Sequence, residues 1–250
     1  MNITAYLIDL DGVIYVENDL VPGAVEKLAE LRAKGVPYRF VTNTSTKGRA
    51  GLVAKLARCG IPAEPAHIVC PPYAAAQYLR SLGSPRCAAF VRRDALVEFD
   101  GLPLVETEAE WVVIGDLEDG WTFARMNQAL RLLLGGAKLI ALGMTRYWRA
   151  SDGPRLDVGS FVTGLTYAAG VQPLVLGKPD PAFFKLAVDD LGVQPGEAAM
   201  IGDDILTDIG GAQSAGLQAI LVRTGKFKPS DLDGPTHPEA VIDSIAHLTV

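Results

Sequence analysis

The chain has 250 residues, of which 49% are hydrophobic and 21% are charged, a composition typical of a soluble globular protein. Its 23 basic and 29 acidic residues give a net charge of −6 without any basic run, so we expect neither a nucleic-acid nor a membrane-surface partner. Three cysteines without a CxxC pair indicate free thiols, and the first residues lack the basic region of a signal peptide. We therefore expect a cytoplasmic protein of one or two domains.

The first part of the chain alternates between apolar runs and helical periodicity. Thr4–Leu10 is a short apolar run that ends at Asp-Leu-Asp-Gly, which predicts a buried strand. A helix is expected over Pro22–Lys34, because Pro22 suits a first helical turn and the glycine at position 35 suits a helix end. A strand, a helix and a short strand are then expected at Val36–Val41, Thr46–Cys59 and Ile68–Cys70.

The last part of the chain repeats this alternation. Strands are expected at Leu174–Leu176, Ala198–Ile201 and Ala219–Val222, and helices at Pro181–Leu191, Thr207–Ser214 and Glu239–Leu248. Strands that alternate with helices form parallel sheets with helices on both faces. We therefore predict an α/β fold whose core is a Rossmann-like, doubly wound parallel sheet.

The middle of the chain has the same alternation, but no predicted strand there ends in a pair of carboxylates. Helices are expected at Tyr73–Leu82, Phe123–Leu134 and Val158–Ala169, and strands at Ala88–Val91, Trp111–Ile114 and Leu139–Leu142. We therefore predict a smaller α/β domain, residues 73–173, inserted into a core formed by residues 1–72 and 174–250.

Acidic residues gather after two of the predicted core strands. Asp9 and Asp11 close the first strand, where residues two apart point the same way. The predicted strand over 198–201 is followed by Asp203, Asp204 and Asp208. Capping of the next helix needs one such residue, and unpaired carboxylates repel one another unless a cation bridges them. Ligands of open parallel sheets bind beyond the carboxyl ends of strands, so the two groups together favour a Mg²⁺ site there over solvated loops.

Two further polar features each follow a predicted strand. Thr42 and Asn43 precede a helix, where a hydroxyl, an amide and backbone N–H groups make an anion site, although for these residues taken alone simple helix capping is the favoured explanation. Lys178 lies between a strand and a helix, where a surface lysine would look the same. All four groups are expected after four strands of one sheet, in the order carboxylates, hydroxyl and amide, lysine, carboxylates.

In this order, the motifs resemble those of haloacid dehalogenase (HAD) superfamily phosphatases. The matching segments are Asp9-Leu10-Asp11-Gly12, Thr42-Asn43, Lys178-Pro179, and Gly202-Asp203-Asp204 together with Asp208. The inserted domain resembles the class II cap of that family. The resemblance covers essentially the whole chain, and the cap is its weaker part.

The resemblance implies a Mg²⁺-dependent phosphatase that works through an aspartyl-phosphate intermediate. It implies Asp9 as the nucleophile, Asp11 as the general acid and base, and Thr42, Asn43 and Lys178 as the phosphate-binding residues. The implied metal ligands are Asp9, the Asp11 backbone carbonyl and Asp203, with Asp204 and Asp208 orienting the groups around them. The implied substrates are small phosphorylated metabolites: phosphate monoesters, with pyrophosphate and phosphoamides as further candidates. A homodimer through the cap is an expectation at the level of the family.

Asp11 favours a phosphatase over a dehalogenase within this superfamily, because a leaving alkoxide needs a proton whereas a leaving halide does not. A cysteine-dependent phosphatase is an alternative, since Cys87 and Arg93 have the Cys-x5-Arg spacing, but the residues between them lack glycine and are typical of a strand. A binding protein that keeps the fold without catalysis is another alternative. The cap segment Met144–Arg149 mixes cations with aromatic rings, and it is interpreted either as a solvent-facing hairpin or as a contact to the leaving group.

Overall fold

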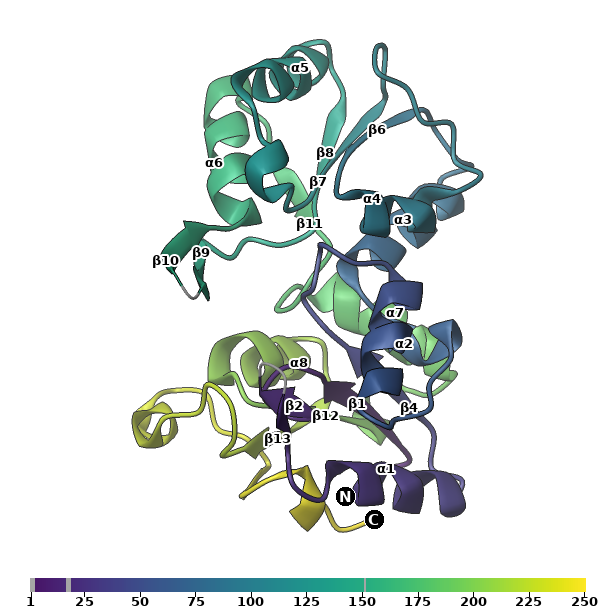
Figure 1. Cartoon of the computed structure of the whole chain (residues 1–250), viewed down its shortest axis with the longest axis vertical. Coiled ribbons are helices and arrows are strands. Elements are labelled where there is room, and N and C mark those ends of the chain that lie inside the picture. The colour runs from purple at the N-terminus through teal and green to yellow at the C-terminus, as the bar shows by residue number, and fades with distance from the viewer. Residues whose placement is uncertain (1–2, 17–18, 151) are drawn as a thin grey trace. The chain divides into compact units, whose positions relative to one another are not determined.

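The structure is a computed structural model, which describes residues 3–16, 19–150 and 152–250 (Figure 1). Contacts between residues divide the chain into two units. The first unit comprises Met1–Thr42, Val53–Val69 and Lys178–Val250, and the second comprises Asn43–Leu52 and Cys70–Gly177. No helix among the described residues is both long enough and apolar enough to cross a membrane.

The first unit is built on a six-stranded parallel sheet with the strand order β14-β13-β12-β1-β4-β5. Its strands are β1 (Ala5–Asp9), β4 (Tyr38–Val41), β5 (Ile68–Val69), β12 (Ala198–Gly202), β13 (Gln218–Val222) and β14 (Ala240–Ile242). Every residue of the central strands β1 and β12 is buried. Strands covered on both faces are continuous apolar runs, which is why periodicity in the sequence detects them.

Helices cover both faces of this sheet, with α1 on one side of the central strands and α7 and α8 on the other (Figure 1). α1 (Ala24–Ala33) buries Leu28 and Leu31, and α7 (Pro181–Leu191) buries Phe183 and Phe184. The second part of α2 (Arg49–Arg58) also belongs to this unit, from Val53 onward. The remaining elements are a π-helical turn (Ile205–Gly210), α8 (Gly211–Ser214), the hairpin β2 (Tyr15–Val16) and β3 (Asp19–Leu20), and 3-10 turns at Pro65–His67, Pro195–Glu197, Pro229–Asp233 and Ile245–His247.

The second unit has a four-stranded parallel sheet with the order β11-β8-β7-β6. Its elements are α3 (Pro71–Ser81), β6 (Cys87–Phe90), α4 (Arg93–Leu96), β7 (Trp111–Ile114), α5 (Phe123–Leu134), β8 (Lys138–Ala141), the hairpin β9 (Tyr147–Ala150) and β10 (Gly153–Leu156), α6 (Val158–Ala169), β11 (Pro173–Val175), and 3-10 turns at Val97–Phe99 and Glu118–Gly120. α5 and α6 lie on the same side of the sheet (Figure 1), where Leu133 and Val162 pack with Val112 of β7. The doubly wound core and the smaller α/β unit predicted from the sequence are both present.

Two predicted elements are corrected by the strand pairing. The helix expected over 239–248 is wrong: β14 pairs in parallel with β13, with Val241 opposite Leu221, and only a short 3-10 turn follows. The strand expected near 174–176 exists as β11, but it pairs with β8 in the second unit, with Leu174 opposite Ile140. Lys178 therefore does not follow a strand of the six-stranded sheet. An apolar run of three residues carries no information about which sheet it joins. The prediction that this strand belongs to the core sheet was therefore wrong.

Candidate active site

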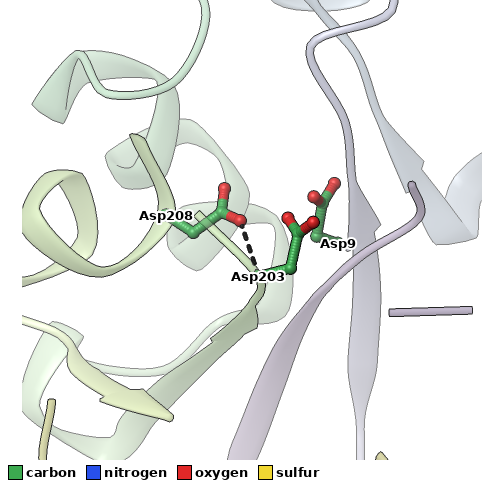
Figure 2. Close-up of side chains that lie close together, drawn as sticks. All are labelled: Asp9, Asp203 and Asp208. Carbon is green, nitrogen blue, oxygen red and sulfur yellow. Dashed lines mark hydrogen bonds between the residues drawn. The ribbon is translucent and has the colours of Figure 1, made fainter. Parts of the chain in front are cut away.

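Asp9, Asp203 and Asp208 form a buried cluster of carboxylates in the first unit. Each offers an oxygen, and these oxygens all lie within 4.8 Å of one another. Asp9 is the last residue of β1 and Asp203 follows β12, and the two strands are parallel neighbours in which Ile8 lies opposite Ile201. Their carboxyl ends are therefore adjacent, and Figure 2 shows the carboxyl groups of Asp9 and Asp203 side by side.

Lys178 provides the cationic group of this cluster. Its Nζ lies 2.7 Å from Asp9 Oδ1 and 2.8 Å from Asp208 Oδ1, and the residue is only 4% exposed. Burial lowers the pKa of Lys178, but the carboxylates of Asp208 and Asp9 more than offset burial and hold this pKa above its ordinary value. Lys178 is therefore charged, and its one ammonium pairs with two carboxyl groups, those of Asp9 and Asp208, in a cluster that holds three. Burial raises the pKa of Asp9 well above its usual range, although Lys178 opposes that shift.

Asp208 fixes the loop that follows β12. Its Oδ2 accepts hydrogen bonds from the backbone N–H groups of Asp203 at 3.1 Å and Asp204 at 3.2 Å, the first of which is the dashed line in Figure 2. A Cβ at Gly202 would lie 2.3 Å from the Cβ of Asp208, so this approach requires glycine. Oδ2 of Asp208 thus holds the loop and Oδ1 pairs with Lys178, so the role of Asp208 is to fix the positions of these two groups.

Asp203 has the oxygen that lacks a partner. Its Oδ2 accepts a hydrogen bond of 2.6 Å from the backbone N–H of Lys226, whereas its buried Oδ1 has no hydrogen-bond partner among the described residues. Burial raises the pKa of Asp203 to about 6, with the N–H of Lys226 opposing the shift and Asp208 adding to it. A buried carboxylate oxygen without a donor, beside other carboxylates, fits a hard divalent cation such as Mg²⁺.

The other predicted site residues lie at different places. The side chain of Asp11 is 53% exposed and is not part of the carboxylate cluster. Thr42 is buried directly after β4, the other parallel neighbour of β1. Asp204 caps the π-helical turn by accepting hydrogen bonds from the N–H groups of Leu206 and Thr207, both at 3.0 Å. Of the site residues predicted from the sequence, the fold thus brings together Asp9, Asp203, Asp208 and Lys178, and it places Asp204 and Thr42 in the adjoining loops.

Asn43 belongs to the second unit, where it lines a pocket of about 250 Å³. The residues that line this pocket are Asn43, Thr44, Ser45, Thr46, Asp116, Glu118, Trp148 and Asp157. Burial raises the pKa of Asp116 and of Asp157. Trp148 comes from the cap segment singled out in the sequence, part of which forms β9, whereas Tyr147 beside it is 54% exposed. The side chain of Arg149 lies outside the described part of the structure.

Three residues that contact this site were not predicted from the sequence: Gly225, Lys226 and Lys55. A Cβ at Gly225 would lie 2.0 Å from Asp203 Oδ2, and the next residue, Lys226, donates to the same oxygen. Both follow β13, the neighbour of β12, so the strand-end argument could have found them. Lys55 of α2 was also missed: its Nζ lies 3.6 Å from Asp11 Oδ1, and a lysine on a helix carries no signal in the sequence.

The alternative built on Cys87 is not supported by its surroundings. Cys87 begins strand β6 and is completely buried, and Arg93 begins α4. Burial raises the pKa of the Cys87 thiol, which opposes formation of the nucleophilic thiolate. A strand also cannot wrap its N–H groups around a phosphate.

The chain is similar to known proteins over nearly its whole length. Residues 6–102 match the family described as haloacid dehalogenase-like hydrolase, and residues 175–248 match a family described as HAD-hydrolase-like. Phospholysine phosphohistidine inorganic pyrophosphate phosphatase of Xenopus laevis is 38% identical over 248 residues, which cover 96% of this chain and 90% of that protein. Haloacid dehalogenase-like hydrolase domain-containing protein 2 of Bos taurus is 41% identical over 229 residues, which cover 92% of this chain and 87% of that protein.

A solved structure adds the same result in three dimensions. The p-nitrophenyl phosphatase from Archaeoglobus fulgidus matches with a TM-score of 0.92 and 30% identity, covering 98% of each chain. The α/β fold and the resemblance inferred from the sequence motifs are thereby confirmed. On the strength of these full-length matches, the chain belongs to the haloacid dehalogenase-like hydrolases and is a phosphatase.

Proposed function

We propose that this phosphatase is Mg²⁺-dependent and that Asp9 is its nucleophile, forming an aspartyl-phosphate. The observation that carries the proposal is a buried cluster at the carboxyl ends of β1 and β12, in which Asp9 lies beside Asp203 and pairs with Lys178. Asp9, Asp203 and the backbone carbonyl of Asp11 would hold the metal. Bound Mg²⁺ would offset the excess negative charge of the carboxylates and lessen the repulsion between a carboxylate and a phosphate dianion.

The contacts of Asp9 support its role as nucleophile. Its Oδ1 accepts a hydrogen bond of 2.8 Å from the N–H of Leu10 and pairs with Lys178 Nζ at 2.7 Å. The carboxylate is thus oriented through one oxygen, and Oδ2 is the atom we assign to the attack on phosphorus. A nucleophile fixed in this way enters the reaction without losing orientational freedom.

Asp11 is the proposed general acid and base. As the Asp9–phosphorus bond forms and the bond to the leaving oxygen breaks, the Asp11 carboxyl gives its proton to that oxygen. Asp11 then takes a proton from the water that attacks the aspartyl-phosphate, which releases inorganic phosphate and restores Asp9. Thr42, Asn43 and Lys178 bind phosphoryl oxygens, while Asp204 and Asp208 keep the loop after β12 in place.

Small phosphorylated metabolites are the proposed substrates. Phosphate monoesters are supported by the nitrophenyl phosphatase similar to this chain, and pyrophosphate and phosphoamides by the name of the 38% identical relative. Residues 73–173 are the proposed cap, inserted between the core segments 1–72 and 174–250. The pocket that Asn43, Thr44 and Trp148 line within the second unit supports a contact between the leaving group and Trp148 of this cap.

We also propose that the protein is cytoplasmic and dimerises through the cap, without nucleic-acid or membrane partners. The three cysteines are free thiols, which suits a reducing compartment. Light scattering of the purified protein tests the dimer. The same measurement is made on a variant in which alanine replaces the exposed aromatic side chains of the cap.

Covalent labelling tests the nucleophile. Wild-type protein mixed with radiolabelled phosphate ester and Mg²⁺ is quenched in acid, which preserves acyl phosphates, and the label is located by proteolysis. We expect label on the peptide that contains Asp9, and none in Asp9→Asn, because an amide cannot form the acyl phosphate. Asp189→Asn, which alters an exposed carboxylate paired with Lys185, serves as the matched control and should label normally. Label on another residue would contradict the assignment.

A further inference from the structure

Lys55 connects Asp11 to the buried part of the first unit. It projects from α2, and its Nζ lies 3.6 Å from Asp11 Oδ1. The same ammonium lies 3.6 Å from the centroid of the Tyr15 ring. Tyr15 is 1% exposed, whereas the Asp11 side chain is 53% exposed. One cation thus contacts both an exposed carboxylate and a fixed aromatic face.

The backbone that carries Asp11 is fixed by a tight turn. The N–H of Gly12 donates to the carbonyl of Tyr15 at 2.7 Å, and the N–H of Tyr15 donates to the carbonyl of Leu10 at 3.2 Å. Gly12 itself packs against Asp203, where a Cβ would lie 2.0 Å from Oδ2. With the backbone fixed in this way, the side chain of Asp11 can still rotate, and the ion pair with Lys55 restricts that rotation.

We propose that Lys55 is a positioning residue, which holds the Asp11 side chain in the orientation needed for proton transfer to the leaving group. The inference rests on the proposed function, in which Asp11 is the proton donor. In that step the Asp9–phosphorus bond forms, the bond between phosphorus and the leaving oxygen breaks, and the proton of Asp11 moves to that oxygen. Misplacement of such a group by about 1 Å can cost a hundredfold in rate.

The leaving group separates this role from a general effect of charge. p-Nitrophenolate is a weak base and departs without a proton, whereas an alkoxide must be protonated as it leaves. Loss of positioning should therefore impair alkyl phosphates far more than p-nitrophenyl phosphate. A lysine that only attracted anionic substrates would affect both substrates alike.

The experiment measures kcat/KM of Lys55→Met, which reports phosphoryl transfer to the enzyme, on ethyl phosphate and on p-nitrophenyl phosphate with saturating Mg²⁺. We expect a loss of about 10- to 100-fold on ethyl phosphate and less than about threefold on p-nitrophenyl phosphate. Lys55→Arg should restore most of the loss. Arg58→Met removes an exposed cation from the same helix and should change neither value. Lys55→Gln replaces Lys55→Met if thermal melting shows that the latter does not fold.

Measurements in an Asp11→Asn variant distinguish a failure of this inference from a failure of the proposed function. Asp11→Asn should itself lose ethyl phosphate turnover selectively, and adding Lys55→Met to it should cause no further selective loss. If Asp11→Asn shows no selectivity, the assigned role of Asp11 fails. If Asp11→Asn is selective, three results would still overturn the positioning role of Lys55. These are an equal loss of kcat/KM on both substrates in Lys55→Met, no loss on either substrate, and a further selective loss when Lys55→Met is added to Asp11→Asn.

Discussion

Gly225 lies against Asp203 so closely that a Cβ at this glycine would be 2.0 Å from Asp203 Oδ2 and 2.6 Å from the Cα of Gly12. The next residue, Lys226, donates its backbone N–H to the same oxygen at 2.6 Å. The loop after β13 thus fixes Oδ2 of Asp203, while the buried Oδ1 has no hydrogen-bond partner among the described residues. Because residue 225 is a glycine and has no Cβ, Asp203 can take the position that it has in the candidate metal site.

Gly225→Ala should therefore disturb Asp203 as well as the backbone. We expect a loss of about 2–4 kcal/mol in the free energy of unfolding, from overpacking together with a φ of +65°. We also expect a lower affinity for Mg²⁺, measured as the metal-induced rise in melting temperature. Gly35→Ala is the control, since φ there is +67° with nothing within 4 Å, and it should cost only about 1 kcal/mol. Equal behaviour of the two variants would show that the contact with Asp203 is unimportant.

Lys178→Met should destabilise the protein strongly. Removal of this buried ammonium leaves Asp9 and Asp208 without the partner that lies 2.7 Å and 2.8 Å from them. Breaking a buried ion pair from one side costs about 3–5 kcal/mol, and we expect a loss of that size in urea unfolding at pH 7.5 without metal. Lys185→Met, which removes an exposed lysine paired with Asp189, should change stability by less than about 0.5 kcal/mol. A small effect of Lys178→Met would mean that the cluster is less charged than we infer.

The raised pKa of Asp203, about 6 in the folded protein against an ordinary 3.8, predicts a pH dependence with a definite sign. The folded state binds this proton more tightly than the unfolded state, so the contribution of Asp203 to stability is present below pH 4 and is lost as pH rises through 6. Without metal, Asp203→Asn should therefore be more stable than wild type at pH 7.5, and the difference should disappear near pH 4. Urea unfolding at both pH values measures it, and a less stable Asp203→Asn at pH 7.5 would contradict it.

The positions of the site residues were predictable where they depend on buried strands. β1 and β12 are uninterrupted apolar runs, and parallel strands meet at their carboxyl ends, so Asp9 and Asp203 could be placed together from the sequence. Short elements were not predictable in this way. The three residues of β11 joined the other sheet, and Val241 and Ile242 formed an edge strand where a helix was expected, because pairing with distant strands decides such segments. Gly225 follows β13, so the same strand-end argument could have placed it, whereas Lys55 contacts Asp11 from a helix through packing that no local pattern encodes.

Removal of metal should abolish turnover if Asp9 and Asp203 hold a cation. We expect EDTA to eliminate hydrolysis of p-nitrophenyl phosphate, Mg²⁺ to restore it and Ca²⁺ to fail. Ca²⁺ accepts more ligands at longer distances, so it can take both oxygens of a carboxylate that Mg²⁺ leaves free to react. The measurement is steady-state activity of EDTA-treated, desalted protein at fixed ionic strength. Full activity in a preparation shown to be free of metal would refute the assignment of Asp9 and Asp203 as ligands.

The pocket of the second unit predicts where substrate preference is determined. Trp148 lines it together with Asn43 and Thr44, which directly follow the phosphate-binding Thr42 of our proposal. Trp148→Ala should lower kcat/KM for the preferred substrate of a phosphate-ester panel, while p-nitrophenyl phosphate is much less affected. Where an arginine of this segment is removed instead, loss of a charged hydrogen bond should cost about 1–3 kcal/mol of transition-state stabilisation. Arg146→Ala and Arg149→Ala test the neighbouring cations in the same way.

Tyr167→Ala is the matched control for this prediction. It removes an aromatic side chain that is 91% exposed on α6 of the same unit and does not line the pocket. We expect it to leave kcat/KM unchanged on every substrate. Because Trp148 is itself 36% exposed, its removal should cost little stability, and thermal melting of both variants checks this. Equal losses of Trp148→Ala on all substrates would place the determinant of specificity elsewhere in the cap, and the segment from Asp157 to Thr163 would be the next to test.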